Sequence, residues 1–343
     1  MIIPFFITHA GCPHRCVFCD QGNITGQARP EDPSGVAPKV RAFLAGKHTD
    51  RPVRIAFYGG TFTALPRDLQ ERYFEAARPF IASGEVESIR ISTRPDAVDD
   101  DILPFLKDRG VAMIELGAQS MDDRVLHLAG RGHTARDTRQ AAARIRERGL
   151  GLGIQLMPGL PGDSEENFRS TVEQVVALRP DCVRIYPALV IKGTPLERLY
   201  RKGAYTPLAL EEAVSWCGAA LLRFREAGID VIRVGLQPTD GLAADGTIVA
   251  GPHHPAFRQI VESSLYLEQM RTALRAMPDG SGPATFFVNP SDLSTAFGQK
   301  RNNIKTLRRE FGMPDIRCVS DPAVRRGGIR FRGADGRDLR NVV

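Results

Sequence analysis

Long apolar runs are missing from this sequence, and so is a positively charged segment at its start. No uninterrupted apolar stretch approaches the roughly 18 residues that a membrane-spanning helix needs. The first ten residues lack the basic segment of a secretory signal peptide and are too short to form one. We therefore expect a cytoplasmic protein that makes no contact with a membrane.

Cysteines are also scarce, and their spacing argues against a disulfide framework. Cys12, Cys16 and Cys19 lie within eight residues, whereas the other three of the six cysteines are isolated. In a reducing compartment such a cluster is typical of a metal site. The remaining composition is that of an ordinary globular protein, because 42% of the 343 residues are hydrophobic and 25% are charged. This length suits about two domains, or one α/β barrel with a small appendage.

Between residues 1 and 236 the sequence alternates short β-branched or aromatic runs with longer helical patterns. Six strands are expected, at residues 2–8, 53–58, 86–92, 111–117, 150–156 and 182–186. Helix signals lie between them, such as Thr134 as an N-cap and Asp163 with Glu166 as a capping box. These strands read as apolar on both faces and are joined by helical crossovers. We therefore expect an α/β fold with a parallel sheet, either doubly wound or closed into a full or partial barrel.

Candidate functional residues follow successive strands of this pattern. The cysteines come after the first expected strand, Gly59 and Gly60 after the second, and Ser92, Gln119 and Gln155 at the ends of the next three. Both doubly wound sheets and barrels place function at the carboxyl ends of their strands. We therefore expect these residues to share one cleft.

The three clustered cysteines have the spacing Cx3Cx2C. Three thiolates on one short loop can bind three irons of a 4Fe–4S cluster and leave the fourth iron open for a substrate or cofactor. The alternative is a structural zinc site completed by His14 or Asp20. Structural zinc sites are usually built from two separated cysteine pairs, and this sequence has no second pair, so the spacing favours the cluster.

A Cx3CxΦC motif after the first strand, with Phe18 as the aromatic residue, resembles the radical S-adenosylmethionine (SAM) superfamily. The resemblance implies a partial parallel (β/α)6-type barrel and two cofactors, a 4Fe–4S cluster held by Cys12, Cys16 and Cys19, and SAM bound to the open iron. It also implies that Phe18 packs on the adenine of SAM. The chemistry of this superfamily is reductive cleavage of SAM to a 5'-deoxyadenosyl radical that abstracts a hydrogen atom.

Further residues match the SAM-binding positions of this superfamily. Gly59, Gly60 and Thr61 resemble its GGE-type element, in which the backbone binds the methionine amino group; Thr61 replaces the acidic residue. By the same resemblance, four side chains are expected to hold the ribose and carboxylate of SAM: Ser92, Gln119, Arg131 and Gln155. For Arg131 the alternative is a solvated arginine at a helix end.

Residues 182–187, 190–196 and 203–205 resemble the radical SAM domain of the Elongator catalytic subunit, and more generally the oxygen-independent coproporphyrinogen oxidases. The Elongator family modifies the wobble uridine of tRNA with a radical SAM domain joined to an acetyltransferase domain. We expect no acetyltransferase domain here, because the residues after 236 show no suitable pattern. Tyr186 and Lys192 are candidate substrate contacts, and Tyr186 also suits a half-buried strand position.

The sequence after residue 236 is organised differently. A Pro/Gly-rich stretch that contains His253 and His254 precedes a helix, and we assign residues 237–283 to a linker loop and helix after a barrel at residues 1–236. Paired histidines can bind metal or shuttle protons, but in a loop they also suit plain solvation. Residues 284–343 hold 12 Lys and Arg against 6 Asp and Glu, which accounts for the whole formal net charge of +6.

This basic tail is expected to fold as a small α+β module. Its predicted order is strand, short helix, four-residue turn at 298–301, second helix and strand, which resembles a KH-type RNA-binding module. The resemblance implies RNA contacts by five residues of the turn and second helix: Gly298, Lys300, Arg301, Lys305 and Arg308. The alternative is a small lid whose basic face is solvated.

Together these features predict a radical SAM enzyme that modifies tRNA or another RNA and receives electrons from a reductant such as flavodoxin or ferredoxin. Two alternatives stay open. One is a radical SAM enzyme that acts on a small-molecule or porphyrin-like substrate, with the tail as a lid. The other is a non-catalytic protein that binds zinc and RNA.

Overall fold

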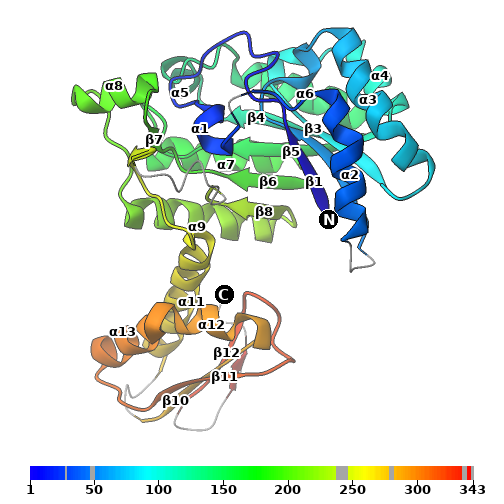
Figure 1. Ribbon diagram of the computed structural model, residues 1–343. Helices are drawn as coiled ribbons and strands as arrows, with labels where there is room; N and C mark the ends of the chain where they lie inside the picture. The colour runs from blue at the N-terminus through cyan, green and yellow to red at the C-terminus, as the bar shows by residue number, and fades with distance from the viewer. Residues whose placement is uncertain (28, 47–50, 237–245, 278–281, 334–337, 341–343) are drawn as a thin grey trace. The chain divides into compact units, whose positions relative to one another are not determined.

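A computed structural model describes residues 1–27, 29–46, 51–236, 246–277, 282–333 and 338–340. The chain divides into two compact units (Figure 1). Unit 1 comprises Met1–Trp216 and Ala220–His253, and unit 2 comprises Cys217–Ala219 and His254–Val343. Each unit has a sheet of its own, so each is described by itself.

The main sheet of unit 1 has seven parallel strands, whose order in space follows their order along the chain. They are β1 (Ile2–Phe6), β2 (Arg54–Tyr58), β3 (Ser88–Thr93), β4 (Val111–Gln119), β5 (Gly151–Leu156), β6 (Cys182–Ile185) and β8 (Asp230–Val234). A doubly wound sheet reverses its strand order at a switch point, and this sheet does not. Because β1 and β8 form its two open edges, the sheet is a partial parallel barrel, as predicted.

All six predicted strands are present, and the structure adds β8, which the sequence analysis missed. This strand lies at an edge of the sheet and pairs with β6 alone. Asp230 and Ile232 are exposed, so the strand lacks the apolar pattern of the buried strands. Two further strands, β7 (Val190–Ile191) and β9 (Ile248–Ala250), pair antiparallel with each other.

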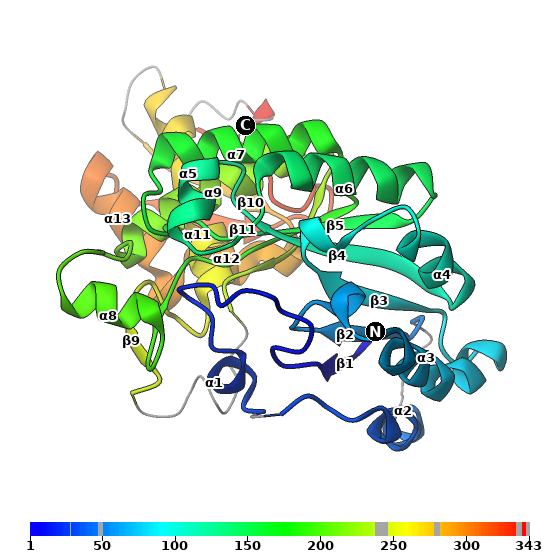
Figure 2. The ribbon, with the colours of Figure 1, turned by 90° about the horizontal axis from the view of Figure 1, so that it is seen from above.

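Helices connect the strands, and the longer ones cover the outer face of the sheet (Figure 2). The helices of unit 1 are α1 (Gln21–Thr25), α2 (Val36–Ala45), α3 (Arg67–Ala82), α4 (Ile102–Asp108), α5 (Asp123–Leu128), α6 (Ala135–Glu147), α7 (Glu165–Leu178), α8 (Pro195–Arg201) and α9 (Leu210–Glu226). Phe5 and Phe57 are fully buried on this face, and the ring of Phe57 lies 5.1 Å from that of Tyr73 in α3. Burial of such side chains stabilises the fold by roughly 25 cal/mol per Å² of apolar surface.

The inner face of the same strands is polar, which corrects the expectation that the strands are apolar on both faces. Arg90 of β3, Glu115 of β4 and Arg184 of β6 alternate along their strands with fully buried aliphatic residues. Glu115 pairs with both arginines. A paired charge cluster therefore occupies positions that apolar layers fill in a closed barrel.

Unit 2 combines helices with a four-stranded sheet in the order β11-β10-β12-β13. Its elements are α11 (Phe257–Arg275), β10 (Ala284–Val288), α12 (Leu293–Phe297), α13 (Asn302–Phe311), β11 (Ile316–Ser320), β12 (Ile329–Arg332) and β13 (Asp338–Arg340). The predicted strand, helix, turn, helix and strand are all found, whereas β12 and β13 were not predicted. Helix α11, which the sequence placed in a linker, buries Tyr266, Met270 and Leu274 in the core of this unit.

The start of helix α6 agrees with its predicted cap. Thr134 Oγ1 accepts a hydrogen bond from Asp137 N–H at 3.3 Å, and Asp137 Oδ2 accepts one from Thr134 N–H at 2.7 Å. Helix α7 starts one residue later than predicted, because Ser164 is its N-cap and accepts from Asn167 N–H at 3.2 Å. Asp163 instead accepts from Gly159 N–H at 2.9 Å, so it closes the preceding turn.

Replacing Thr134 by alanine should lower the free energy of unfolding by about 1 kcal/mol, because the first turn of α6 loses its side-chain acceptor. Urea denaturation should show a lower midpoint with an unchanged slope. Gln140→Ala, at an exposed position of the same helix, is the control and should change stability by less than about 0.5 kcal/mol. Equal stability of the two variants would contradict the role of the cap.

Candidate functional site

The cysteine loop follows β1 at the carboxyl end of the strand. Cys16 is buried, and Cys12 and Cys19 are half-buried. A backbone hydrogen bond from Val17 N–H to Ala129 O, at 3.0 Å, ties the loop to the end of α5. Burial raises the pKa of Cys12, and it raises the pKa of Cys19 to about 12. These two thiols are therefore protonated when no metal is bound, and metal binding must displace their protons.

The glycines after β2 lie directly against this loop. Cys12 Sγ is 3.4 Å from Thr61 Oγ1, and Thr61 N–H donates to Ala10 O at 2.8 Å. Gly60 has φ +56°, and a Cβ there would lie 2.3 Å from Ala10 O. Only glycine fits this position. The structure thus places Gly59, Gly60 and Thr61 beside the loop that carries the first cysteine.

Gln21 joins the two loops and was not identified from the sequence. Its Oε1 accepts hydrogen bonds from Gly60 N–H at 2.9 Å and from His9 N–H at 2.6 Å. Its own N–H donates to His9 Nε2 at 2.9 Å. A single glutamine two residues after the last cysteine carries no recognisable spacing, so only the fold reveals this role.

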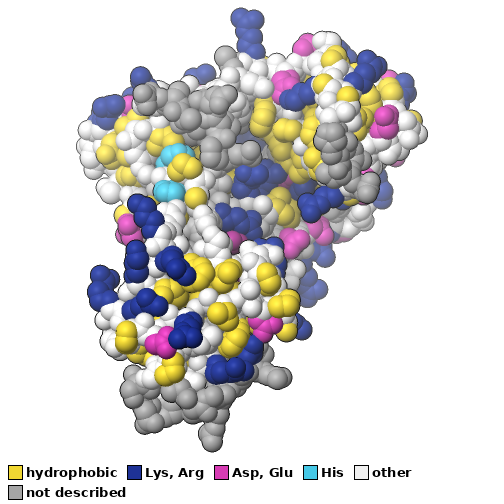
Figure 3. Space-filling model, turned by 60° about the horizontal axis from the view of Figure 1, so that its bottom comes forward, with side chains coloured by type: hydrophobic (Ala, Val, Ile, Leu, Met, Phe, Trp, Pro, Cys, Tyr) yellow, Lys and Arg dark blue, Asp and Glu magenta, His cyan; other side chains and the backbone are white. Residues whose placement is uncertain are grey.

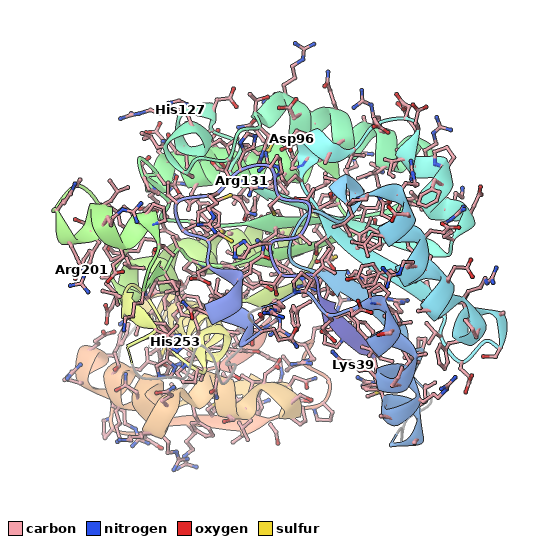
Figure 4. The ribbon with its side chains drawn as sticks, turned by 45° about the horizontal axis from the view of Figure 1, so that its top comes forward. Lys39, Asp96, His127, Arg131, Arg201 and His253 are labelled. Atoms are coloured by element: carbon pink, nitrogen blue, oxygen red, sulfur yellow. The ribbon has the colours of Figure 1, made fainter. Side chains whose placement is uncertain are left out.

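Arg131 points into the interior of unit 1 (Figure 4) and is only 6% exposed. Its Nη1 donates to Cys16 Sγ at 3.1 Å, and its Nη2 donates to Gly117 O. Its Nε is buried without a hydrogen-bond partner among the described residues. This burial excludes a solvated arginine at a helix end, and it places a positive charge beside the cysteine loop.

Two of the predicted glutamines meet at the carboxyl end of the sheet. Gln155 Nε2 donates to Gln119 Oε1 at 3.0 Å. Gln119 has φ +69°, and the pairing of β4 with β5 shifts register just before it. A Cβ at Gly117 would lie 2.9 Å from Gln119 Nε2, so Gln119 packs on the strand segment that Arg131 also contacts.

The remaining predicted residues of unit 1 are placed in different surroundings. Ser92 is half-buried in β3, with its backbone in register with Glu115. Phe18 is 8% exposed and packs in an apolar cluster that includes Cys16. Tyr186 is half-buried, and Arg184 Nη1 donates to its Oη at 3.4 Å. Lys192 is exposed after β7, where its charge acts on Glu197, so it does not join the inner-face residues.

A polar network on the inner face is the main feature that sequence reasoning missed. Glu115 Oε1 is 3.1 Å from Arg90 Nη2 and accepts from Tyr58 Oη at 3.2 Å, while Glu115 Oε2 is 2.8 Å from Arg184 Nε. The signal was present, because each charged residue stands between two aliphatic residues in the tripeptides IRI, IEL and VRI. A period of two with charges on one side indicates a strand whose second face is polar.

The paired histidines are not part of a metal site among the described residues. His254 Nδ1 accepts from Ala256 N–H at 3.0 Å, just before α11, and this bond orders the chain at the start of the helix. Among the residues that the structure describes, no group of three His, Cys, Asp or Glu is arranged around a single metal ion.

The same finding bears on the cysteine loop. A structural zinc site needs four ligands around one ion, so the three cysteines would need a fourth ligand. Of the two candidates, Asp20 caps α1 and His14 lies at the surface. In a 4Fe–4S cluster each thiolate binds a different iron, so three sulfur atoms need not meet at one point. Three thiols on one loop, with Arg131 directed at Cys16, fit the cluster.

Comparison with known proteins agrees with this geometry. The family model for the radical SAM superfamily matches residues 6–175, and the model for the radical SAM C-terminal domain matches residues 180–266. The chain belongs to the radical SAM superfamily. Radical SAM proteins are enzymes that use a 4Fe–4S cluster and SAM, so the predicted enzyme class and both predicted cofactors are confirmed.

Curated relatives support the predicted branch of the superfamily. A tRNA uridine(34) acetyltransferase of Methanocaldococcus infernus is 28% identical over 255 residues, which are 62% of this chain and 47% of the relative. A protein of the same name from Dehalococcoides mccartyi is 30% identical over 57% of this chain and 50% of its own length. This radical SAM chain therefore spans about half the length of these relatives.

A solved structure shows the same fold. The archaeal Elp3 of Methanocaldococcus infernus, with an N-terminal deletion, superposes with a TM-score of 0.60 at 22% sequence identity. The matched region covers 79% of this radical SAM chain and 63% of the Elp3 chain. The resemblance to the Elongator catalytic subunit is thus confirmed at the level of fold and family. Among the described residues, no helix combines the length and the apolar character needed to cross a membrane.

His133 lies close to this site and is held neutral. It is 4% exposed, and its Nε2 is 3.2 Å from Ala118 O. Burial, assisted by the charges of Arg131 and Arg94, lowers the pKa of His133 to about 3. The unfolded chain binds a proton at this histidine below about pH 6.5, whereas the folded chain stays neutral down to about pH 3, so folding loses stability as pH falls through this window.

We expect His133→Gln to weaken the pH dependence of the free energy of unfolding between pH 7.5 and pH 5. The histidine should account for a loss of about 2 kcal/mol over this range, at about 1.4 kcal/mol per pH unit below 6.5. Urea titrations at both pH values measure the change. The exposed His127→Gln is the control and should keep the wild-type dependence, and a His133→Gln variant that did the same would refute the assignment.

Proposed function

We propose that Cys12, Cys16 and Cys19 hold the 4Fe–4S cluster of this radical SAM enzyme. The supporting observation is the contact of Arg131 with Cys16, because it joins the cysteine loop to the end of β4. Hydrogen bonds to the sulfur ligands tune the reduction potential of such clusters. In this proposal Arg131 has two roles, to orient Cys16 and to present a positive charge at the cofactor site.

We propose that SAM lies along the carboxyl ends of β2 to β5. Its contacts would come from residues of those loops and strand ends, together with Phe18 for the adenine: Gly59, Gly60, Thr61, Ser92, Gln119, Arg131 and Gln155. The close approach of Gly60 to the cysteine loop and the contact between the two glutamines support a single continuous site. A cluster held by the three thiolates would supply the electron for reductive cleavage of SAM.

The chain's own residues have three tasks in this reaction. The cysteine loop and Gly60 fix the position of the thiolates, since the backbone leaves no space for a Cβ. The apolar cluster around Phe18 and Cys16 excludes water from one side of the site. Arg131 provides a buried cation for an anionic group, and a charge-assisted bond of this kind is worth ~1.5 to 3 kcal/mol.

We propose tRNA or another RNA as the substrate, with a flavodoxin or ferredoxin as reductant. The relatives named tRNA uridine(34) acetyltransferases support an RNA role for the radical SAM part that they share with this chain. The acetyl transfer in their name is not carried over, because about half of their length is unmatched. Tyr186, at the end of β6, is the proposed substrate contact on the inner face, and the exposed Lys192 would contact the substrate at the surface.

The basic surface of unit 2 supports RNA binding as well. Figure 3 shows Lys and Arg side chains gathered on its surface. Lys300 and Arg301 are exposed and adopt φ of +51° and +60°, so the turn after Gly298 projects two consecutive cations. Lys305 is also exposed, whereas Arg308 donates to Ile316 O at 3.0 Å and is partly tied to its own unit.

Anaerobic reconstitution should load about four irons per chain, and dithionite should then release 5'-deoxyadenosine from SAM. Replacing Cys12, Cys16 or Cys19 by alanine should abolish the iron content and the cleavage together, because each thiolate holds its own iron. Cys318→Ala, which removes an isolated buried thiol of unit 2, is the control and should retain both. Stoichiometric zinc without iron–sulfur absorption in the reconstituted protein would reject the proposal.

Binding of tRNA should weaken steeply with salt, with a log-log slope of about −0.7 per phosphate contact on single-stranded segments. Removing Lys300 and Arg301 together by alanine should reduce the slope by about 1 to 2, because two contacts are lost. The control removes two exposed arginines of α6, Arg136 and Arg139, and should leave the slope unchanged. Equal slopes in all three proteins would favour a small-molecule substrate.

A further inference from the structure

Among the described residues, the inner face of the unit 1 sheet carries more buried positive than negative charge. Arg90 and Arg184 share a single carboxylate, Glu115, at 3.1 and 2.8 Å. The side chains of Arg90 and Glu115 are 7% and 5% exposed, and that of Arg184 is 15% exposed. A buried ion pair repays its desolvation only when the charges balance, so a second cation on one carboxylate lacks a counterion.

Among the residues that the structure describes, the neighbouring side chains do not supply the missing negative charge. Burial raises the pKa of Tyr58, of Tyr186 and of Cys182, so all three are neutral at physiological pH. Arg233, on the adjacent strand β8, adds a further positive charge near Tyr186. Among the described residues of this face, buried or half-buried arginines therefore outnumber the one buried carboxylate.

Arg90 also has an unused donor. Its Nη2 contacts Glu115 and lies 3.4 Å from Cys182 Sγ, but its Nε is buried without a hydrogen-bond partner among the described residues. An unsatisfied buried donor on a charged group is costly, and a bound acceptor would relieve that cost. An oxyanion would both balance the excess positive charge and accept a hydrogen bond from the unsatisfied Nε of Arg90.

The network lies close to the proposed cofactor site. Glu115 precedes Gly117 by two residues on β4, and Gly117 O is the acceptor of Arg131, which contacts Cys16. Two residues of a strand span about 6.6 Å. An anion bound by the network would therefore lie about two residues along β4 from the position of Gly117, farther from the carboxyl end of the strand.

We propose that Arg90, Arg184 and Tyr186 bind an anionic group of the substrate, a carboxylate or a phosphate, on the inner face of the sheet. This inference rests on the proposed radical SAM reaction, because the bound anion would orient the substrate toward the radical. Arg184 Nη1 already contacts Tyr186 Oη at 3.4 Å, so the cation and a phenolic donor are held together. Tyr58, under the guanidinium of Arg184 at 4.5 Å, positions the arginine.

The test measures anion binding to the reconstituted protein by calorimetry, with inorganic phosphate and acetate as probes and chloride at matched ionic strength as the reference. We expect saturable binding of one phosphate or one acetate per chain. Arg90→Gln should weaken it at least tenfold, since the remaining Arg184 and Glu115 balance each other. Arg78→Gln, an exposed arginine of α3, is the matched control and should bind as the wild type does. Preference for phosphate would indicate a nucleotide group, and preference for acetate a carboxylate.

A purely structural network would behave differently. If Arg90 serves only to neutralise Glu115, Arg90→Gln should lower the melting temperature in anion-free buffer and leave phosphate affinity unchanged, which would overturn the proposal. Under the proposal, Arg90→Gln keeps the melting temperature in that buffer, because an uncompensated buried charge is removed. Glu115→Gln supplies a second measurement, since the folded variant should bind phosphate at least tenfold more tightly.

Saturating SAM separates the substrate site from the cofactor site. We expect SAM to leave phosphate binding intact, and complete displacement of phosphate by SAM would assign the arginines to the cofactor carboxylate and reject the inference. Iron content and 5'-deoxyadenosine formation are measured in parallel. Loss of both with anion binding retained would reject the proposed function alone, whereas their presence without binding of either probe would reject this inference alone.

Discussion

The single carboxylate of Glu115 allows one sheet to bury apolar side chains on one face and guanidinium groups on the other. The outer face buries aliphatic and aromatic side chains under helices, while the inner face buries guanidinium groups. Charges can be buried there only because Glu115 accepts from strands on both sides of β4, namely from Arg90 of β3, Arg184 of β6 and Tyr58 of β2. This arrangement keeps the inside of the partial barrel polar.

A second constraint is the lack of space between the cysteine loop after β1 and the glycine loop after β2. Gly60 lies so close to the carbonyl groups of Ala10 and Ile7 that a Cβ would approach them to 2.3 and 2.6 Å. Gln21 and Thr61 then complete the contact with hydrogen bonds. The position of the cysteines thus depends on Gly60 as much as on the loop that carries them, which links the cysteine loop to the second strand.

The two units carry different candidate functional residues. Unit 1 contains the cysteine loop and the polar inner face, and unit 2 contains the basic turn at Gly298 and the cations of α13. The core of unit 2 includes Tyr266 and Met270 of α11, so this helix is an integral part of its fold. In the proposed function, an RNA bound by such a surface would be held mainly through its phosphates, and the choice of the reacting nucleoside would fall to the inner face of unit 1.

The sequence by itself determined the family and the parallel sheet and indicated the cysteine loop as a candidate site, because these depend on local patterns. The Cx3Cx2C spacing, the glycine pair after a strand and the capping residues around Thr134 all act over a few residues. Only the tertiary structure decided that Arg131 meets Cys16 across 115 positions, that Gln21 bridges two loops and that Glu115 pairs with two arginines. A pattern of alternating residues reveals that a strand has two faces, but which side chains pair across those faces is set by the register and curvature of the sheet.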